Sequence, residues 1–186
     1  RADECVAHMR RLESDARSLQ RRLPVEAAEF YSELGRCQRA EGEPRVARLL
    51  FQRSLEVRRN ALEDTAGVVE NLGDLADLER DAGRTEAAME GFRNALAQLQ
   101  AKVGNRYPLA IGLRQRLCDL ERSAGRLVVA ELDCHSALSL ALDLYGEDHP
   151  SSVNARRQLA AIHADLGRFR EAGDAYRSSQ RWLIAR

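Results

Sequence analysis

The sequence predicts an all-α fold, an array of stacked antiparallel helix pairs, and three observations predict it. Alanine, leucine, glutamate and arginine dominate the 186 residues while aromatic residues make up only 5%, a composition that favours helices over strands. Glycines recur at a nearly constant interval. Small and large apolar residues recur at fixed distances from each of these glycines, as they do in helical repeat arrays.

The interval is set by four glycines. Gly42, Gly83, Gly125 and Gly167 are separated by 41, 42 and 42 residues. Glycine tolerates the positive φ that a tight turn between two helices requires. The sequence therefore predicts a first helix before each of these glycines and a second, antiparallel helix after it.

Columns of residues at fixed offsets from the glycines indicate where the two helices of a pair approach each other. The first helix carries a leucine followed by a small residue, and the second carries an alanine, a larger residue and another small one. In the column of larger residues Cys134 is the weak match. In order, the columns are Leu34, Leu75, Leu117 and Leu159; Gly35, Ala76, Cys118 and Ala160; Ala47, Ala88, Ala130 and Ala172; Phe51, Phe92, Cys134 and Tyr176; Ser54, Ala95, Ala137 and Ser179.

These columns resemble the signature of tetratricopeptide repeats, although the usual period is about 34 residues. The junctions KVGNRYP (102–108) and LYGEDHP (144–150) lie 42 residues apart and are similar to those of the long-period repeats of kinesin light chains and of many bacterial signalling proteins. The resemblance implies an α-α superhelix of about four helix pairs within residues 24–186. The expected repeats cover about 25–60, 67–102, 109–144 and 151–186.

The first junction, NALEDTAG (60–67), departs from this pattern. It has neither histidine nor proline and is one residue short. We expect the first repeat to pack at a slightly different angle.

Residues 1–23 form a separate predicted helix, and two interpretations of it stay open. Its apolar residues alternate at spacings of 4 and 3, as in a short coiled coil. Cys5 and Met9 also lie 42 residues before an alanine and a phenylalanine of the columns, which favours a half-repeat or a capping helix. Leu12, at a position for a small residue, speaks against a perfect match.

The resemblance also implies a binding surface, because partners of such repeats usually bind a concave face lined mainly by the first helices. Arginine recurs on these helices, and its planar group of donors pairs well with carboxylate or phosphate. The groove candidates are Arg36, Arg39, Asp74, Asp77, Arg80, Gln115, Asp119, Arg122, Asn154 and Arg157.

An alternative interpretation of the arginines is a solvated ladder of ion pairs, and we favour it slightly. Asp77 precedes Arg80, and Asp119 precedes Arg122, by three residues, a spacing at which side chains on a helix meet. Acidic residues beside the arginines make a partner of mixed charge more plausible than a simply acidic one.

Several classes of function are not expected. A formal net charge of zero, from 29 basic and 29 acidic residues, speaks against nucleic-acid binding, and the short apolar runs speak against a membrane span. No glycine-rich phosphate loop, catalytic Ser-His-Asp order or metalloprotease helix is present, so we expect neither catalysis nor a cofactor. Asp148 and His149 lie in a turn between repeats, where helix capping is the favoured role.

The cysteines predict neither a metal site nor disulfides. They form no CxxC pair and have no partner at the spacing of a zinc finger. We expect free thiols in a reducing compartment, which favours a cytoplasmic location. The four are Cys5, Cys37, Cys118 and Cys134.

The sequence thus predicts a protein-binding scaffold that holds a peptide or a partner helix. The alternative is a regulatory or oligomerising segment of a larger signalling protein, such as a bacterial kinase or transcription regulator, with contacts made by the terminal helices. Trp182 and Ile184 form an apolar end that packs back on the preceding helix or continues into a further repeat or a second subunit. The abrupt ends of the chain favour a fragment of a longer protein.

Overall fold

A computed structural model describes residues 23–104 and 106–184 of the chain. It describes the side chains of these residues except those of Ala61 and of residues 180–184. The helix predicted over 1–23 therefore lies outside the described residues apart from Leu23, as do the side chains of Trp182 and Ile184.

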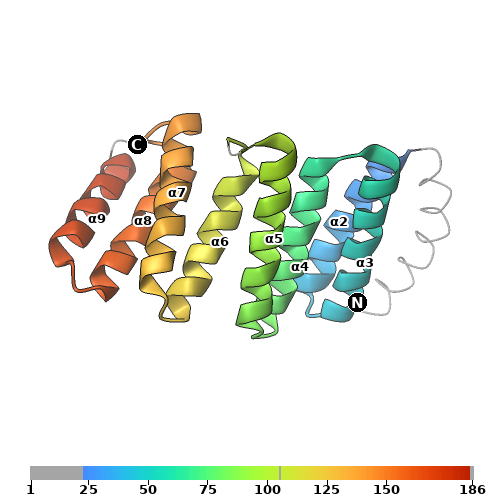
Figure 1. The fold of residues 1–186 in the computed structure, drawn as a ribbon, viewed down its shortest axis with the longest axis horizontal. Helices are drawn as coiled ribbons and strands as arrows, with labels where there is room; N and C mark the ends of the chain where they lie inside the picture. The colour runs from blue at the N-terminus through green and yellow to red at the C-terminus, as the bar shows by residue number, and fades with distance from the viewer. Residues whose placement is uncertain (1–22, 105, 185–186) are drawn as a thin grey trace. The chain divides into compact units, whose positions relative to one another are not determined.

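Within the described residues every regular element is a helix and no strand occurs (Figure 1), which confirms the all-α prediction. The elements are α2 (Pro24–Ala40), α3 (Pro44–Val57), the π-helical turn η1 (Arg58–Leu62), α4 (Thr65–Asp81), α5 (Thr85–Val103), α6 (Leu109–Ser123), α7 (Leu127–Tyr145), α8 (Pro150–Asp165) and α9 (Phe169–Ile184).

The chain divides into two compact units, residues 1–78 and 79–186, and the boundary falls inside α4. In the first unit α2 packs against α3. In the second unit α6 packs against α7 and α8 against α9, and α7 also contacts α8. Each unit therefore builds its core from helices that follow one another in the sequence.

The turn inside each pair has the geometry that the glycines predict. Gly42, Gly83, Gly125 and Gly167 have φ values of 82°, 72°, 74° and 74°. In the first turn the amide of Gly42 donates to the Arg39 carbonyl at 3.1 Å and that of Glu43 to the Gln38 carbonyl at 2.8 Å. This pair of bonds is a Schellman motif, which satisfies the last carbonyls of the helix, and the other three turns repeat it.

The junction after α3 differs from those after α5 and α7. Gly104 and Gly146 end α5 and α7 with φ of 90° and 82°. Glu63 occupies the same column of the repeat, 21 residues after the turn glycine, and has φ 49°. A left-handed conformation costs a residue with a Cβ about 1 kcal/mol. The departure seen in the sequence thus corresponds to the π-helical turn η1, followed by a strained residue.

Two columns of the repeat face each other across a helix pair, and the first pair shows how closely. A Cβ built on Gly35 would lie 2.6 Å from Cε1 of Phe51, so only glycine lets the ring reach the α2 backbone. Phe51 is fully buried and packs with Ala47 and Leu78. The small residue of α2 therefore makes room for the large residue of α3.

In the second unit the same two columns hold cysteines, and the prediction of free thiols is wrong for them. Cys118 of α6 and Cys134 of α7 form a disulfide with their Cα atoms 5.5 Å apart, within the range that this bond requires. Both are fully buried, whereas Cys37 is free and exposed. Because disulfides are typical of oxidising compartments, the argument for a reducing compartment loses its support, and the cytoplasmic location stays a prediction.

Candidate functional site

The groove candidates of the first unit form ion pairs between α2 and α4. Arg36 contacts Asp74 at 3.2 Å and Glu33 of its own helix at 2.6 Å, and Arg39 contacts Asp77 at 3.3 Å. The aspartate side chains are only 10% and 4% exposed. Desolvation lowers the pKa of Arg36, but the carboxylates around it, Asp74 above all, raise the pKa overall.

In the second unit α6 and α8 are joined in a similar way. Arg122 donates to Asp165 at 2.6 Å, and this hydrogen bond is the main reason that the pKa of Arg122 is raised. Gln115 donates to the Ser151 carbonyl at 3.1 Å, and Gln158 donates to the Gln115 carbonyl at 3.2 Å. The first helices of successive pairs are therefore joined by side chains.

Most of the predicted arginine column thus takes part in ion pairs. Arg36, Arg39 and Arg122 reach carboxylates on the first helix of the following pair, and Arg80 contacts Asp81 of its own helix at 3.2 Å. Glu33 and Arg36 pair within α2 at the three-residue spacing of such helix ion pairs. The longer links between helices depend on packing and are not visible in the spacing.

A polar depression of about 360 Å³ lies on the surface of the first unit. Four carboxylates and two guanidinium groups line it, so its charge balance is acidic. One of the groove candidates, Arg36, belongs to it. The lining residues are Glu29, Ser32, Glu33 and Arg36 of α2, Arg58 of η1, Asp64, and Ala66, Gly67 and Glu70 of α4.

The base of this depression is a buried network of hydroxyl and amide groups. Ser32 and Ser54 lie 2.9 Å apart, Asn71 donates to Ser32 at 3.1 Å, and Ser54 donates to the Ala28 carbonyl at 2.8 Å. Arg58 donates to Ser54 at 3.2 Å. Because each of these groups has a hydrogen-bond partner, the network holds α2, α3 and α4 together.

Asp64 connects this network to the start of α4. One of its oxygens accepts a hydrogen bond from the Gly67 amide at 3.0 Å, which is an N-cap, and the other binds the buried guanidinium of Arg58. A Cβ on Gly67 would lie 1.5 Å from Nη1 of Arg58. Gly67 is therefore needed for Arg58 to lie against α4.

A second depression, of about 270 Å³, lies on the second unit. It has one carboxylate and two guanidinium groups, so its charge balance is basic. Four groove candidates meet in it: Asp119, Arg122, Asn154 and Arg157. The other lining residues are Gln158, Ala161 and Tyr176.

Sequence reasoning missed Arg58, Asp64 and Gly67 as parts of the first depression. The irregular junction 60–67 was the available signal, because Asp64 and Gly67 lie in it and Arg58 lies just before it. Nothing in the residue types indicated a π-helical turn. Tyr176 belongs to the column of larger residues, yet it is 42% exposed and lines the second depression.

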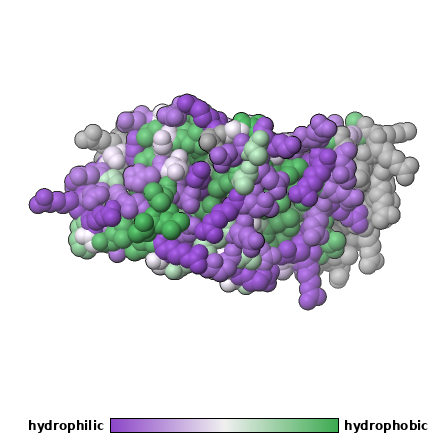
Figure 2. All heavy atoms as spheres, viewed as in Figure 1, coloured by the Kyte–Doolittle hydropathy of each residue, from purple (hydrophilic) through white to green (hydrophobic). Residues whose placement is uncertain are grey.

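Exposed apolar side chains gather on the second unit. Figure 2 shows hydrophobic surface over α7 and the helices beside it, and the large apolar residues exposed there include Val128 (66%), Leu132 (65%) and Phe169 (74%).

Among the described helices, none is long and apolar enough to span a bilayer.

The turn before α8 has the capping role that was expected, with one difference. His149 rather than Asp148 provides the cap, since its Nδ1 accepts a hydrogen bond from the Ser151 amide at 3.2 Å. The imidazole also stacks on Tyr145, with ring centroids 4.1 Å apart. Pro150 is the first residue of the helix.

Several solved structures have the same fold. BtubC (BKLC) from P. vanneervenii has a TM-score of 0.89 at 19% identity, over 99% of this chain and 74% of that one. The apo form of RapI has a TM-score of 0.76 at 16% identity, over 98% of this chain and 68% of that one. The nearly identical TPR-like repeats of a kinesin light chain protein from Podosopora anserina have a TM-score of 0.65 at 16% identity, over 96% of each chain.

The fold is that of tetratricopeptide-like repeats. The resemblance seen in the glycine columns is therefore confirmed at the level of structure. No family model matches the sequence, and no curated protein matches it either. The likeness to these structures shows the fold, and the function has to be argued from the surface of this chain.

Proposed function

We propose that this chain is a protein-interaction module without catalytic activity, which binds an extended peptide segment of mixed charge. The observation that carries the proposal is the presence of two polar depressions of opposite charge balance, one on each unit. Both are lined mainly by first helices of the pairs, the elements that the groove prediction selected.

The charges of the lining residues suggest which ligand side chain each depression binds. Four carboxylates against two guanidinium groups in the first depression favour a lysine or arginine side chain. Two guanidinium groups against one carboxylate in the second favour an acidic side chain, and Tyr176 adds an aromatic surface of the kind enriched at binding sites. Gln158 and Asn154 supply amide donors and acceptors suited to a peptide backbone.

Peptides selected from a random display library against the full chain test this proposal. We expect enriched peptides to carry both basic and acidic residues. Glu29→Lys in the first depression and Arg157→Glu in the second should each weaken binding about tenfold or more, as loss of a central contact does.

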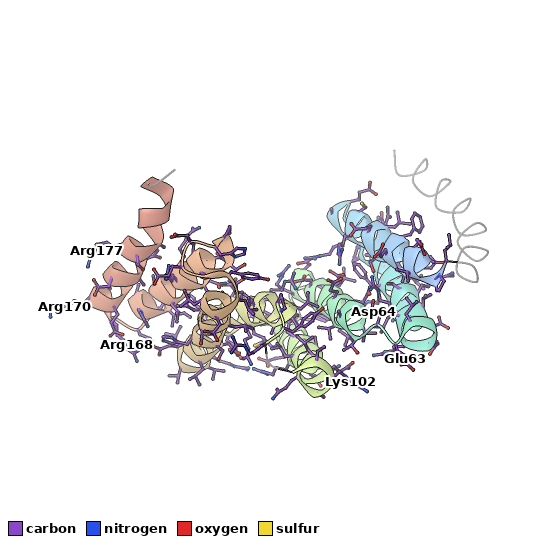
Figure 3. All side chains as sticks on the ribbon, turned by 90° about the horizontal axis from the view of Figure 1, so that it is seen from above. Glu63, Asp64, Lys102, Arg168, Arg170 and Arg177 are labelled. Atoms are coloured by element: carbon purple, nitrogen blue, oxygen red, sulfur yellow. A yellow bond between two sulfur atoms is a disulfide. The ribbon has the colours of Figure 1, made fainter. Side chains whose placement is uncertain are left out.

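Two controls carry the same charge changes outside the depressions. Glu56→Lys lies on α3, and Arg170→Glu lies on α9, where Figure 3 shows Arg170 and Arg177 projecting outward. Both controls should bind like the unmodified chain. Equal loss in the controls and the depression variants, or enriched peptides of one charge sign only, would contradict the proposal.

A further inference from the structure

The second unit gathers imidazole and carboxylate groups that the depressions do not use. Glu131 and His135 are four residues apart on α7, a spacing that puts both on one face of the helix, and His163 meets them from α8. One ligand atom of each lies within 4.8 Å of the others. We propose that Glu131, His135 and His163 form a binding site for a divalent transition-metal ion of the zinc class.

The residue types suit such an ion. Imidazole nitrogens and a carboxylate oxygen are common zinc ligands, at about 2.0–2.2 Å from the metal. The ligand atoms here must therefore approach each other by about 1 Å. His135 is exposed and free to rotate toward the buried His163, whose ring centroid lies 6.3 Å from its own.

His163 is the anchor of the site. Its side chain is only 10% exposed, and its Nε2 lies 3.1 Å from Oε1 of Glu131. Its Nδ1 is buried without a hydrogen-bond partner, and a buried polar atom in that state costs free energy. Nε2 is the ring nitrogen that faces the carboxylates of Glu131 and Glu171, so it is the atom that would bind the ion.

Two further charged groups face the cluster, and they act in opposite directions. Arg168 contacts Oε1 of Glu131 at 2.7 Å and competes with a cation for that oxygen, but its side chain is 43% exposed and can move into solvent. Glu171 of α9 lies 3.9 Å from Nε2 of His163 and is 57% exposed. It is placed to become a fourth ligand.

The site is separate from the second depression. His163 follows Asn154 by nine residues, which puts it about 180° around α8. The sequence-based expectation of no metal site depended on spacing along the chain. Ligands 4 and 28 residues apart on two helices form no recognisable motif, so only the packing of α7 against α8 reveals them.

Zinc titration of the full, disulfide-bonded chain in competition with a chromophoric chelator tests the proposal. All proteins carry Cys5→Ser and Cys37→Ser, which remove thiols that would bind zinc. We expect one zinc ion per chain, with the affinity reduced at least about tenfold by His135→Ala. His135 is exposed, so this variant should keep its helicity by circular dichroism.

Arg168→Gln gives a test of opposite sign, because removal of the competing guanidinium should raise the affinity for zinc. His149→Ala removes an imidazole elsewhere and should leave the affinity unchanged. Absence of zinc binding, equal binding by His135→Ala and its parent, or an Arg168→Gln variant that binds zinc more weakly would each overturn the proposal.

Discussion

The first unit fills the space between its paired helices with Phe51 packed onto Gly35, whereas the second unit joins the same two columns with the Cys118–Cys134 disulfide. The two solutions occupy equivalent positions in the repeat. The comparison teaches that the fold requires a filled contact between the two columns and does not specify how it is filled. A glycine with an aromatic ring, or two cysteines, meet that requirement.

The units also differ in the polar part of their interiors. The first buries a network of serine, asparagine and arginine side chains, while the second buries Glu121, whose side chain is inaccessible and accepts a hydrogen bond from Arg93 at 2.6 Å. The hydroxyl and amide groups of the first network have mutual partners and cost little to bury, whereas the buried carboxylate of Glu121 is costly even though it is paired. The ionisation of Glu121 should therefore make the stability of the second unit depend on pH.

The largest expected effect concerns the disulfide. Its reduction, or Cys118→Ala with Cys134→Ala, should lower the free energy of unfolding by about 3 kcal/mol, the value for closure of a loop of this size. Urea unfolding with and without reductant measures it. If the columns are equivalent, Cys118→Gly with Cys134→Phe should recover part of this loss under reducing conditions. A double variant no more stable than the alanine pair would break the comparison.

The second prediction contrasts two glycines inside helices. Gly35→Ala should destabilise the first unit by about 1–3 kcal/mol through overpacking against Phe51. Gly112→Ala in α6 should stabilise the second unit by about 0.5–1 kcal/mol, because a Cβ there meets no atom within 4 Å. Chemical denaturation of both variants checks the difference in sign, and two effects of the same sign would refute the assignment of the close approach to Gly35.

A third, smaller effect is expected at the irregular junction. Glu63→Gly should relieve the left-handed strain and stabilise the chain by up to about 1 kcal/mol. Gly104→Ala provides the converse, since it places a Cβ at the same column with φ 90°. The midpoint temperature of thermal unfolding should rise for Glu63→Gly and fall for Gly104→Ala.

The smallest effect is a dependence on pH. Desolvation, only partly offset by the hydrogen bond from Arg93, raises the pKa of Glu121, and nearby Asp133 raises it further. A carboxyl with a raised folded-state pKa contributes stability below its unfolded pKa and loses it as the pH rises through the folded value. The unmodified chain should therefore lose stability relative to Glu121→Gln as the pH rises from about 4, near the ordinary pKa, toward neutrality. Unfolding curves at several pH values test the sign, and a constant difference would contradict it.

Much of the fold was predictable because it depends on local chemistry. The turn glycines needed a positive φ, and the columns of small and large residues placed the helix crossings. The disulfide was not predicted, although the sequence contains the spacing that allows it. Cys118 and Cys134 stand 16 residues apart, at the same spacing as Gly35 and Phe51, in columns defined by size and not by reactivity.

The candidate surface was less predictable than the fold. Residue spacing identified the arginines of the first helices, but their partners Asp74 and Asp165 lie 38 and 43 residues away along the chain. The base of the first depression depends on η1, which arises from a junction one residue shorter than the others. Such a local change in backbone geometry has no signature in residue type.

The disulfide has a mechanical consequence. When the chain is pulled by its ends, force entering α6 passes through the sulfur bridge to α7 and leaves the turn at Gly125 unloaded. The 16-residue separation between the cysteines then hides about 50 Å of extensible chain. Reduction would release that length, so the redox state of one pair of side chains sets how far this molecule stretches before its backbone is taut.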